Sequence, residues 1–130
     1  MKALSIIQPH ASLIANGIKH IETRSWKTNY RGRILIHASK TRIPKTVKQN
    51  SELMSLIGDP KALPFGSLIC EAKLVDCLRI DRYLIEAIRD VYPTELICGY
   101  YSDGRYAWFL EDIKPIEPIA VKGHLGIWNY

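Results

Sequence analysis

The sequence has few cysteines and no recognisable metal-ligand spacing, which excludes several classes of protein. Its three cysteines form no CxxC pair, and Pro9 interrupts the short apolar start of the chain before a secretory leader could form. A disulfide framework is therefore not expected, and a reducing compartment fits better. The histidines show no HxH or HExxH spacing, so no metal site is expected. No apolar run approaches the ~18 residues of a membrane span, and we expect a cytoplasmic protein with no cofactor and no membrane partner.

Common signatures of catalysis are missing as well. The chain has no glycine-rich phosphate loop, no GxSxG elbow and no Cys–His nucleophile pattern. It does carry an excess of positive charge, with 18 Lys and Arg against 13 Asp and Glu, for a net charge of +5. Long-range attraction makes nucleic acid a better candidate partner than a basic protein. With 130 residues and no repeat or linker, the chain is expected to be a single domain over residues 1–130.

Alternation of apolar and polar residues predicts a curled or closed sheet of about six short strands. A phase slip at Val75-Asp76 predicts a β-bulge. Pro115 and Pro118 confine part of one strand to a sheet edge or a bulge, because proline cannot donate to the ladder. Strands 20–26 and 33–38 are expected to be antiparallel neighbours, since only a short polar link joins them. The expected strands are residues 2–7, 20–26, 33–38, 67–80, 106–111, 113–122 and 125–130.

Three helices are expected between these strands. The first begins near Pro9 and ends at Asn16-Gly17, where glycine tolerates the left-handed backbone. The second covers residues 43–57 in helical spacing, and the third follows Asp81 as its N-cap. The sequence thus predicts an α+β fold, a small β-barrel of about six strands with two or three flanking helices.

The most informative stretch runs from Gly17 to Trp26. Ionisable residues are uncommon in strands, yet Glu22 and Arg24 fall on one face of a regular strand, together with Trp26. Lys19 joins that face only if it lies in the turn after Gly17. Such a trio can bind a nucleobase and its phosphate: Glu22 accepts from an exocyclic amine, and the cations contact phosphate or carbonyl oxygens. Trp26 offers a stacking surface, but the same residues are equally compatible with an exposed strand and a weak surface ion pair.

This stretch resembles the GxKxxExR motif of the ASCH domain family, which is related to the PUA-like RNA-binding folds. The resemblance covers nearly the whole chain and keeps its segments in order. Residues 5–9 (SIIQP) are similar to the opening of the family, and residues 35–40 (LIHASK) to the segment after the motif. Residues 122–128 (KGHLGIW) are similar to its end. The family implies a small PUA-like barrel whose cleft contains the motif and binds RNA or nucleotides.

Some branches of the family resemble enzymes, so the resemblance also implies an alternative function. One branch removes the acetyl group from N4-acetylcytidine, and another cleaves RNA. In the deacetylating branch a threonine nucleophile stands where this chain has Glu22, and it acts with the motif lysine, here Lys19. Thr23 is adjacent but is expected on the opposite face of the strand. A second departure is His10, where many relatives have tryptophan.

Further candidates lie outside the motif. Arg31 lies in a basic-aromatic turn that suits a phosphate backbone, although a solvated turn explains it equally well. Ser39 and Lys40 end a strand and can add donors to the cleft. The loop before Tyr106 can cover the cleft, with Tyr106 or Arg105 reaching in. The residues expected to bind the ligand are Gln8, Lys19, Glu22, Arg24, Trp26, Arg31, Ser39, Lys40 and Tyr106.

Three functions stay open at this stage. The leading hypothesis is binding of RNA or a nucleotide-sized ligand in the cleft. The second is a small hydrolase acting on a modified nucleoside or on RNA, with Lys19 and Glu22 as catalytic residues. The third is a module that binds a protein partner through the exposed aromatic segment near Tyr100. The oligomeric state does not follow from the sequence.

Overall fold

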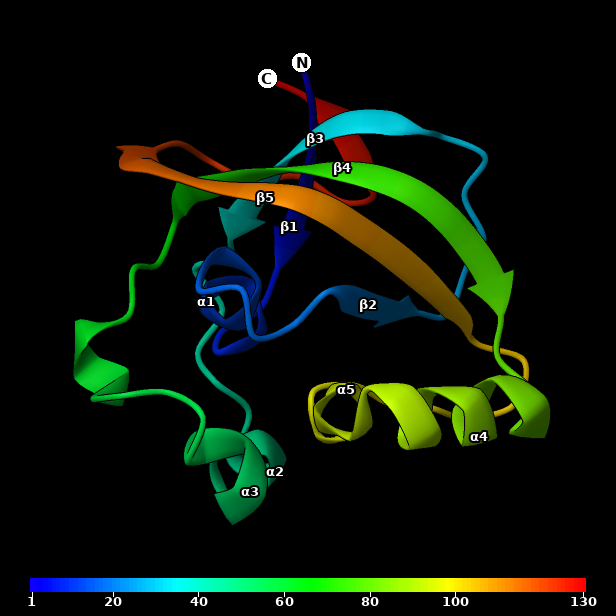
Figure 1. Cartoon of the computed structure of the whole chain (residues 1–130). Coiled ribbons are helices and arrows are strands. Elements are labelled where there is room, and N and C mark those ends of the chain that lie inside the picture. The colour runs from blue at the N-terminus through cyan, green and yellow to red at the C-terminus, as the bar shows by residue number, and fades with distance from the viewer.

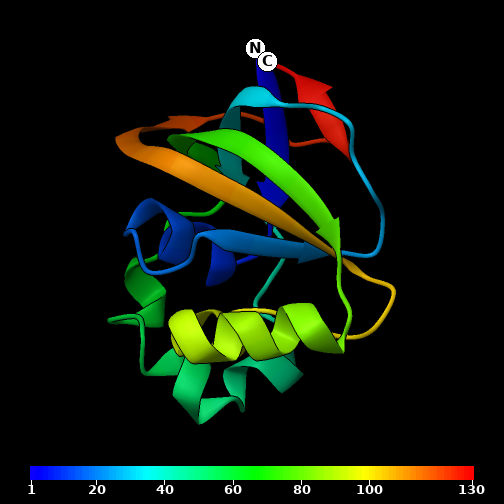
Figure 2. The same ribbon diagram turned by 45° about the vertical axis from the view of Figure 1, so that its right-hand side comes forward.

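A single six-stranded sheet forms the centre of the computed structural model, which describes all 130 residues (Figures 1 and 2). The strand order is β2-β5-β4-β3-β1-β6, and β1 and β3 are the one parallel pair. Because β2 and β6 lie at opposite edges of the sheet, it is a curled half-barrel with an open side. The strands are β1 (Lys2–Ile6), β2 (Ile21–Arg24), β3 (Gly32–Ala38), β4 (Ser67–Arg79), β5 (Tyr106–Ala120) and β6 (Ile127–Asn129).

Five short helices accompany the sheet, which confirms the predicted α+β class and the number of strands. Two or three helices were expected, and the excess has two causes. The helix expected over residues 43–57 is divided at Asn50, whose side chain caps the second piece, and a further helix follows directly after the predicted one at Asp81. The helices are α1 (His10–Ala15), α2 (Lys45–Lys48), α3 (Ser51–Met54), α4 (Arg82–Val91) and α5 (Pro93–Ile97), with a short 3-10 helix η1 (Pro60–Ala62).

The long strands β4 and β5 arch over α1 (Figure 1). Apolar residues on the concave side of the arch pack against α1 and form the largest core cluster, which includes Ile14, Ile36, Trp108 and Leu110. A smaller cluster around Ile88 joins α4 to the far ends of β4 and β5. The helix α1 therefore packs against the concave side of the half-barrel, as one of the helices expected beside the sheet.

Two local predictions can be compared with the observed register. The expected bulge at Val75-Asp76 is confirmed by a register shift between Leu74 and Asp76. The expected pairing of strands 20–26 and 33–38 is wrong, because β2 pairs with β5 whereas β3 pairs with β4 and β1. Proximity in the sequence is misleading here, since β4 and β5 lie between β2 and β3 in the sheet.

The two strands expected at 106–111 and 113–122 are one continuous strand, β5. It bends at Asp112, where the backbone has a φ of 49°. Beyond Phe109 the strand pairs with β4 alone. No second strand therefore needs a backbone N–H donor from Pro115 or Pro118, which proline lacks. The prolines thus lie on a sheet edge as predicted, but within a strand that continues through them.

Candidate functional site

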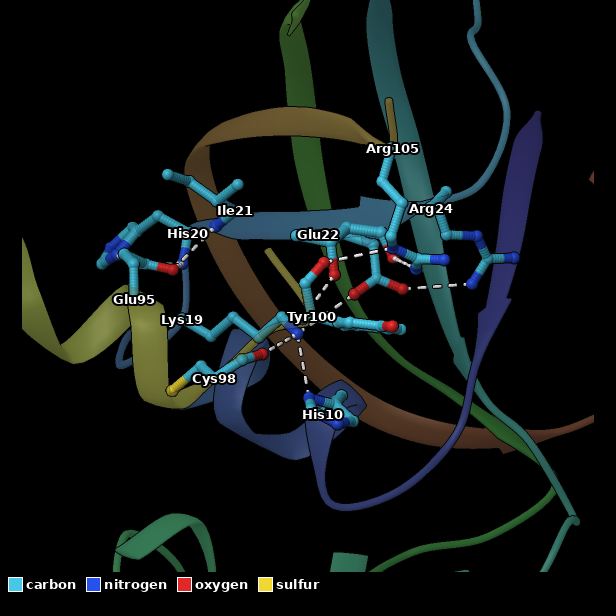
Figure 3. Close-up of polar contacts among 11 residues, drawn as sticks. His10, Lys19, His20, Ile21, Glu22, Arg24, Glu95, Cys98, Tyr100 and Arg105 are labelled. Carbon is cyan, nitrogen blue, oxygen red and sulfur yellow. Dashed lines mark hydrogen bonds and ion pairs between the residues drawn. The ribbon is translucent and has the colours of Figure 1, made fainter. Parts of the chain in front are cut away.

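A cavity of about 810 Å³, which we call the main cavity, opens where α1, β2 and the segments after α5 and β5 meet. Segments from both ends of the chain and from its middle contribute to its walls. Figure 3 shows the polar residues at its centre, which extend from β2, α1 and the loop after α5. The walls combine side chains of Lys, Arg, His, Ser and Thr with only a few apolar ones.

Lys19 lies at the centre of these contacts (Figure 3). Gly17, at a φ of 77°, ends α1, and the backbone amides of Ile18 and Lys19 both donate to Leu13 in the tight turn that follows. The turn directs the Lys19 side chain inward, where it is only 1% exposed. Its ammonium contacts Nδ1 of His10 at 2.9 Å, Oε1 of Glu22 at 3.1 Å and the carbonyl oxygen of Cys98. Three acceptors match the three hydrogens of the group.

Glu22 holds the carboxylate of the main cavity. It lies on β2 opposite Trp108 of β5, and its second oxygen accepts from Nη1 of Arg24 at 3.1 Å. Burial alone would raise the pKa of the Glu22 carboxyl, but the adjacent Lys19 and Arg24 outweigh it, so the pKa is held below its usual value. Glu22 is therefore a buried, ionised acceptor at neutral pH.

His10 contacts the same ammonium from α1. Burial and the charge of Lys19 lower the pKa of His10 from 6.5 to about 4. At neutral pH the imidazole is thus uncharged, and its Nδ1 accepts from Lys19. The other ring nitrogen then carries the proton and is a hydrogen-bond donor. The sequence singled out His10 only as a departure from relatives, whereas the structure makes it part of the cavity wall.

Glu95 fixes the start of β2 from outside the cavity. Its buried carboxylate accepts hydrogen bonds from the backbone amides of His20 at 2.9 Å and Ile21 at 3.1 Å (Figure 3). At the start of β2, which is an edge strand, the Glu95 carboxylate on α5 therefore accepts the backbone hydrogen bonds that a neighbouring strand would otherwise accept. Sequence reasoning missed Glu95, because a single acid in a short helix gives no signal of its distant partner.

Tyr100 and Arg105 form the wall beside Arg24. The hydroxyl of Thr23 accepts from the backbone amide of Tyr100 at 3.0 Å, and the Arg105 guanidinium donates to the backbone oxygens of Tyr100 and Thr23. The same guanidinium lies 4.8 Å from the centre of the Tyr100 ring, which remains 67% exposed. These contacts hold an aromatic face at the mouth of the cavity. The expectation that Arg105 reaches toward the cleft agrees with this placement.

A second network holds the wall formed by residues 122–126. His37 lies buried on β3, with its Nε2 2.7 Å from the carbonyl oxygen of Val121 and its Nδ1 3.0 Å from Oγ of Ser5. Since a carbonyl can only accept, Nε2 carries the proton and Nδ1 accepts from Ser5. Gly123 passes so close that a Cβ there would lie 2.5 Å from the Ser5 hydroxyl. This packing holds Lys122 and His124 at the cavity wall.

The charged side chains that line the main cavity are mostly positive. Among its lining residues Glu22 is the one carboxylate, and it is already paired with Lys19 and Arg24. The lysines and arginines that line the cavity are Lys19, Arg24, Lys40, Arg105 and Lys122. Such a wall attracts an anion and offers one acceptor to groups that donate hydrogen bonds.

Five of the nine sequence-predicted site residues lie in this wall. They are Lys19, Glu22, Arg24, Ser39 and Lys40. Two further lining residues come from the basic segment after β3, namely Thr41 and Thr46. The short motif and the end of strand β3 thus converge on one cavity, although β2 and β3 are not neighbours in the sheet.

The structure places the remaining four predicted residues elsewhere. Gln8 is fully buried and bonds to Ser12 and to the carbonyl of Pro64, so it holds the chain before α1. Trp26 lies beyond the end of β2 and packs edge-on against Trp108, with ring centres 4.7 Å apart. Strand parity had predicted that Trp26 shares a face with Glu22, but the strand ends at Arg24 before that parity applies.

Arg31 and Tyr106 are likewise not part of the cavity wall. Arg31 donates to the carbonyl oxygens of Thr28 and Tyr30 and lies 3.7 Å from Asp76. Tyr106 begins β5 and packs against the main core cluster. Arg105, which precedes Tyr106 in the sequence, lines the cavity instead, together with Tyr100.

No three His, Cys, Asp or Glu side chains lie close enough together to hold a metal ion. All three cysteines are buried thiols, and burial raises the pKa of Cys70 to about 12. None of the helices has the length and apolar character needed to cross a membrane. The polar groups that line the main cavity are its cations, its one carboxylate and uncharged side chains of Ser, Thr, His, Asn and Tyr.

The fold and the position of the motif define a recognised class of domain. The sequence model of the ASCH domain matches residues 4–120, so the chain belongs to the ASCH domain family. This family is associated with RNA binding in general.

Relatives and solved structures agree with this assignment. The chain is 40% identical over 133 aligned positions to Activating signal cointegrator 1 of Homo sapiens, and the match to the Mus musculus protein has the same identity. Each match covers 97% of this chain but only 22% of the relative, so the chain spans about a fifth of those proteins. The crystal structure of an ASCH protein from Zymomonas mobilis has a TM-score of 0.56 at 22% identity, covering 92% of this chain and 72% of that chain. A point mutant of the same Zymomonas mobilis protein has a TM-score of 0.55 at 20% identity, covering 92% and 74%. These structures are similar in fold.

Proposed function

We propose that the protein binds RNA by seating one nucleotide in the main cavity. The observation that carries this proposal is the buried, ionised Glu22, which faces a cavity whose other charged lining side chains are all cations. A ligand that suits such a wall carries negative charge at one point and hydrogen-bond donors at another. A nucleotide has both, in its phosphate and in the amino and imino groups of its base.

Each group in the wall has a matching part of a nucleotide. Lys40, Arg105 and Lys122 are cations without a carboxylate partner in the structure, and they suit a phosphate. Glu22 accepts from a base N–H group, as carboxylates do with the amine of cytosine. The exposed Tyr100 ring, supported by Arg105, offers a face on which a base can stack. The association of the family with RNA binding supports the same ligand class.

The hydrolase alternative is less well supported by the contacts of Lys19. Its ammonium already donates to His10, Glu22 and the Cys98 carbonyl, so it has no free lone pair and no free hydrogen for a substrate. A catalytic base at this position would first have to give up one of these bonds. Lys19 instead acts as the positioning residue that keeps the Glu22 carboxylate fixed and ionised.

The proposal is tested by fluorescence anisotropy of a short labelled single-stranded RNA, titrated with wild-type protein across a range of salt concentrations. Arg24→Ala removes a charged donor beside Glu22 and should weaken binding roughly 10- to 150-fold, the range for a hydrogen bond to a charged group. Arg31→Ala is the matched control, because Arg31 is an arginine outside the cavity wall. It should change affinity less than twofold.

Two results would overturn the proposal. One is the absence of salt-dependent binding, since phosphate contacts make affinity fall steeply with salt. The other is an equal loss of affinity in Arg24→Ala and Arg31→Ala, which would assign binding to surface charge. Incubation of the protein with N4-acetylcytidine, followed by assay of released acetate, tests the hydrolase alternative; turnover that Lys19→Ala abolishes would favour the hydrolase.

A further inference from the structure

A second groove of about 310 Å³, which we call the side groove, lies next to the main cavity. Lys40 lines both of them, so the two are neighbours that share this side chain. The side groove is formed by the chain after β3, by α2 and by the connection that contains η1. Its lining residues are Lys40, Arg42, Ile43, Lys48, Pro60, Lys61 and Phe65.

The charge of the side groove is entirely positive. Four of its seven lining residues are lysine or arginine, and no carboxylate lines it. None of these four cations forms an ion pair in the structure, whereas Arg24, Arg31, Arg33 and Arg79 all do. Like charges gathered without counter-charges repel one another, and an anion bound among them relieves that repulsion. A run of phosphates is an anion that can contact all four.

Phe65 adds an aromatic surface to these cations. Its side chain is 39% exposed, although a phenyl ring has no polar group to gain from contact with water. The adjacent Gly66 donates to the carbonyl of Ala38 at 2.7 Å and accepts from the amide of Val121 at 3.1 Å. These bonds tie the backbone beside Phe65 to the end of β3 and to the segment after β5, so the ring extends from a fixed point.

Gly66 also accounts for the course of the Lys40 side chain that the two cavities share. A Cβ at Gly66 would lie 2.8 Å from Cγ of Lys40, so the lysine stem passes directly over the glycine. The φ of 66° at this position favours glycine as well. The Lys40 stem therefore lies against the backbone next to Phe65.

We propose that the side groove binds the nucleotide adjacent to the one in the main cavity, so that the ligand is a single RNA strand that runs through both. The adjacent base stacks on Phe65, and the backbone phosphates contact Lys40, Arg42, Lys48 and Lys61. Cations that follow a backbone beside an aromatic platform are the general means of binding single strands with little sequence preference. The inference rests on the proposed function, since it extends the same strand beyond the main cavity.

The test compares a ligand that fills only the main cavity with one long enough to reach the side groove. Cytidine 5′-monophosphate is titrated by calorimetry, and a labelled cytidine hexaribonucleotide is titrated by anisotropy. Phe65→Ala should weaken hexamer binding roughly 5- to 150-fold, the range for loss of one stacked base. Affinity for the mononucleotide should not change. Tyr83→Ala, which removes an exposed aromatic ring on α4, is the matched control and should leave both affinities unchanged.

The double variant Lys48→Gln/Lys61→Gln tests the phosphate contacts. The slope of log affinity against log salt for the hexamer should become shallower by about 1.4, since each phosphate neutralised on a single strand contributes about 0.7. Arg89→Gln on α4 removes a comparable surface charge on the opposite side of the molecule from η1 (Figure 1) and should leave the slope unchanged.

The outcomes separate this inference from the proposed function. Failure of both ligands to bind would overturn the proposed function itself. If both bind and the groove variants match wild type on the hexamer, the inference is wrong and the proposed function stands. A parallel loss for mononucleotide and hexamer in Phe65→Ala would also refute the inference, because it would show a general structural role. A deoxycytidine hexanucleotide titrated in the same way identifies the type of strand, and tighter binding of this DNA than of the RNA hexamer would overturn the assignment to RNA.

Discussion

The substitution Glu22→Gln tests how much the negative charge of the buried carboxylate, as distinct from its size and shape, contributes to stability. It keeps the size of the side chain and one acceptor oxygen but removes the negative charge. Lys19, which is 1% exposed, then remains a buried ammonium whose acceptors, His10, the Cys98 carbonyl and the new amide oxygen, are all uncharged. Arg24 also loses its ion pair.

The expected loss of stability follows from this unbalanced charge. Removing one partner of a buried pair typically costs about 3–5 kcal/mol, because the remaining charge is left without compensation. The cost here should be near the lower limit, about 3 kcal/mol, since glutamine still accepts one hydrogen bond. In addition, the Arg24 side chain is 23% exposed and can be solvated. For a chain of this length, that corresponds to a fall in Tm of about 10 °C.

The assay is urea unfolding of wild type and variant as a function of pH. The folded-state pKa of Glu22 is lower than its ordinary value of 4.5, so the ionised carboxylate stabilises the fold fully above pH 4.5. That contribution is lost as the pH falls through the folded-state pKa. The difference between wild type and Glu22→Gln should therefore be constant near neutrality and shrink below pH 4.5.

A difference of less than about 1 kcal/mol at pH 7 would refute this reasoning, since a buried charge left unpaired costs more than that. It would show that uncharged acceptors alone satisfy the Lys19 ammonium. The double variant Lys19→Met/Glu22→Gln is the control, because removing both charges leaves no uncompensated ion. It should be more stable than the sum of the two single effects predicts.

Two further predictions concern the supports of the motif. His10 is neutral in the fold with a pKa of about 4, so the unfolded state binds more protons between pH 6.5 and pH 4. Wild-type stability should fall by up to about 3 kcal/mol across this range relative to His10→Asn, at about 1.36 kcal/mol per pKa unit; urea unfolding that shows a constant difference would contradict this. Glu95→Ala leaves the amides of His20 and Ile21 buried without an acceptor. It should cost about 2–4 kcal/mol and speed hydrogen exchange at Ile21, whereas unchanged exchange would show that another group takes over.

The parts of the fold that depend on local sequence could be predicted. The cap at Asp81, the bulge near Asp76 and the turn after Gly17 each follow from residues within a few positions of one another. The α+β class and the number of strands follow from the same local patterns. The motif residues Lys19, Glu22 and Arg24 also meet in one wall, because the turn and one short strand position all three.

The parts that depend on distant residues could not be predicted. The pairing of β2 with β5 joins Glu22 to Trp108, and nothing near Glu22 in the sequence indicates that partner. Glu95 supports the motif from more than seventy positions away, for the same reason. Strand parity failed for Trp26 because it assumed a strand longer than the one that forms. Patterns of alternation indicate which face a residue occupies but not where pairing ends.

The ends of the chain have a consequence of a different kind. The amino group of Met1 donates to the carbonyl oxygen of Tyr130 at 2.8 Å, and the two termini lie side by side in both views (Figures 1 and 2). Segments attached to the two termini would therefore start from almost the same point in space. The domain can be placed within a loop of a host protein through very short linkers, without separating the sequences on either side of the insertion. For the same reason, joining the two ends and opening the chain elsewhere would require only a few added residues.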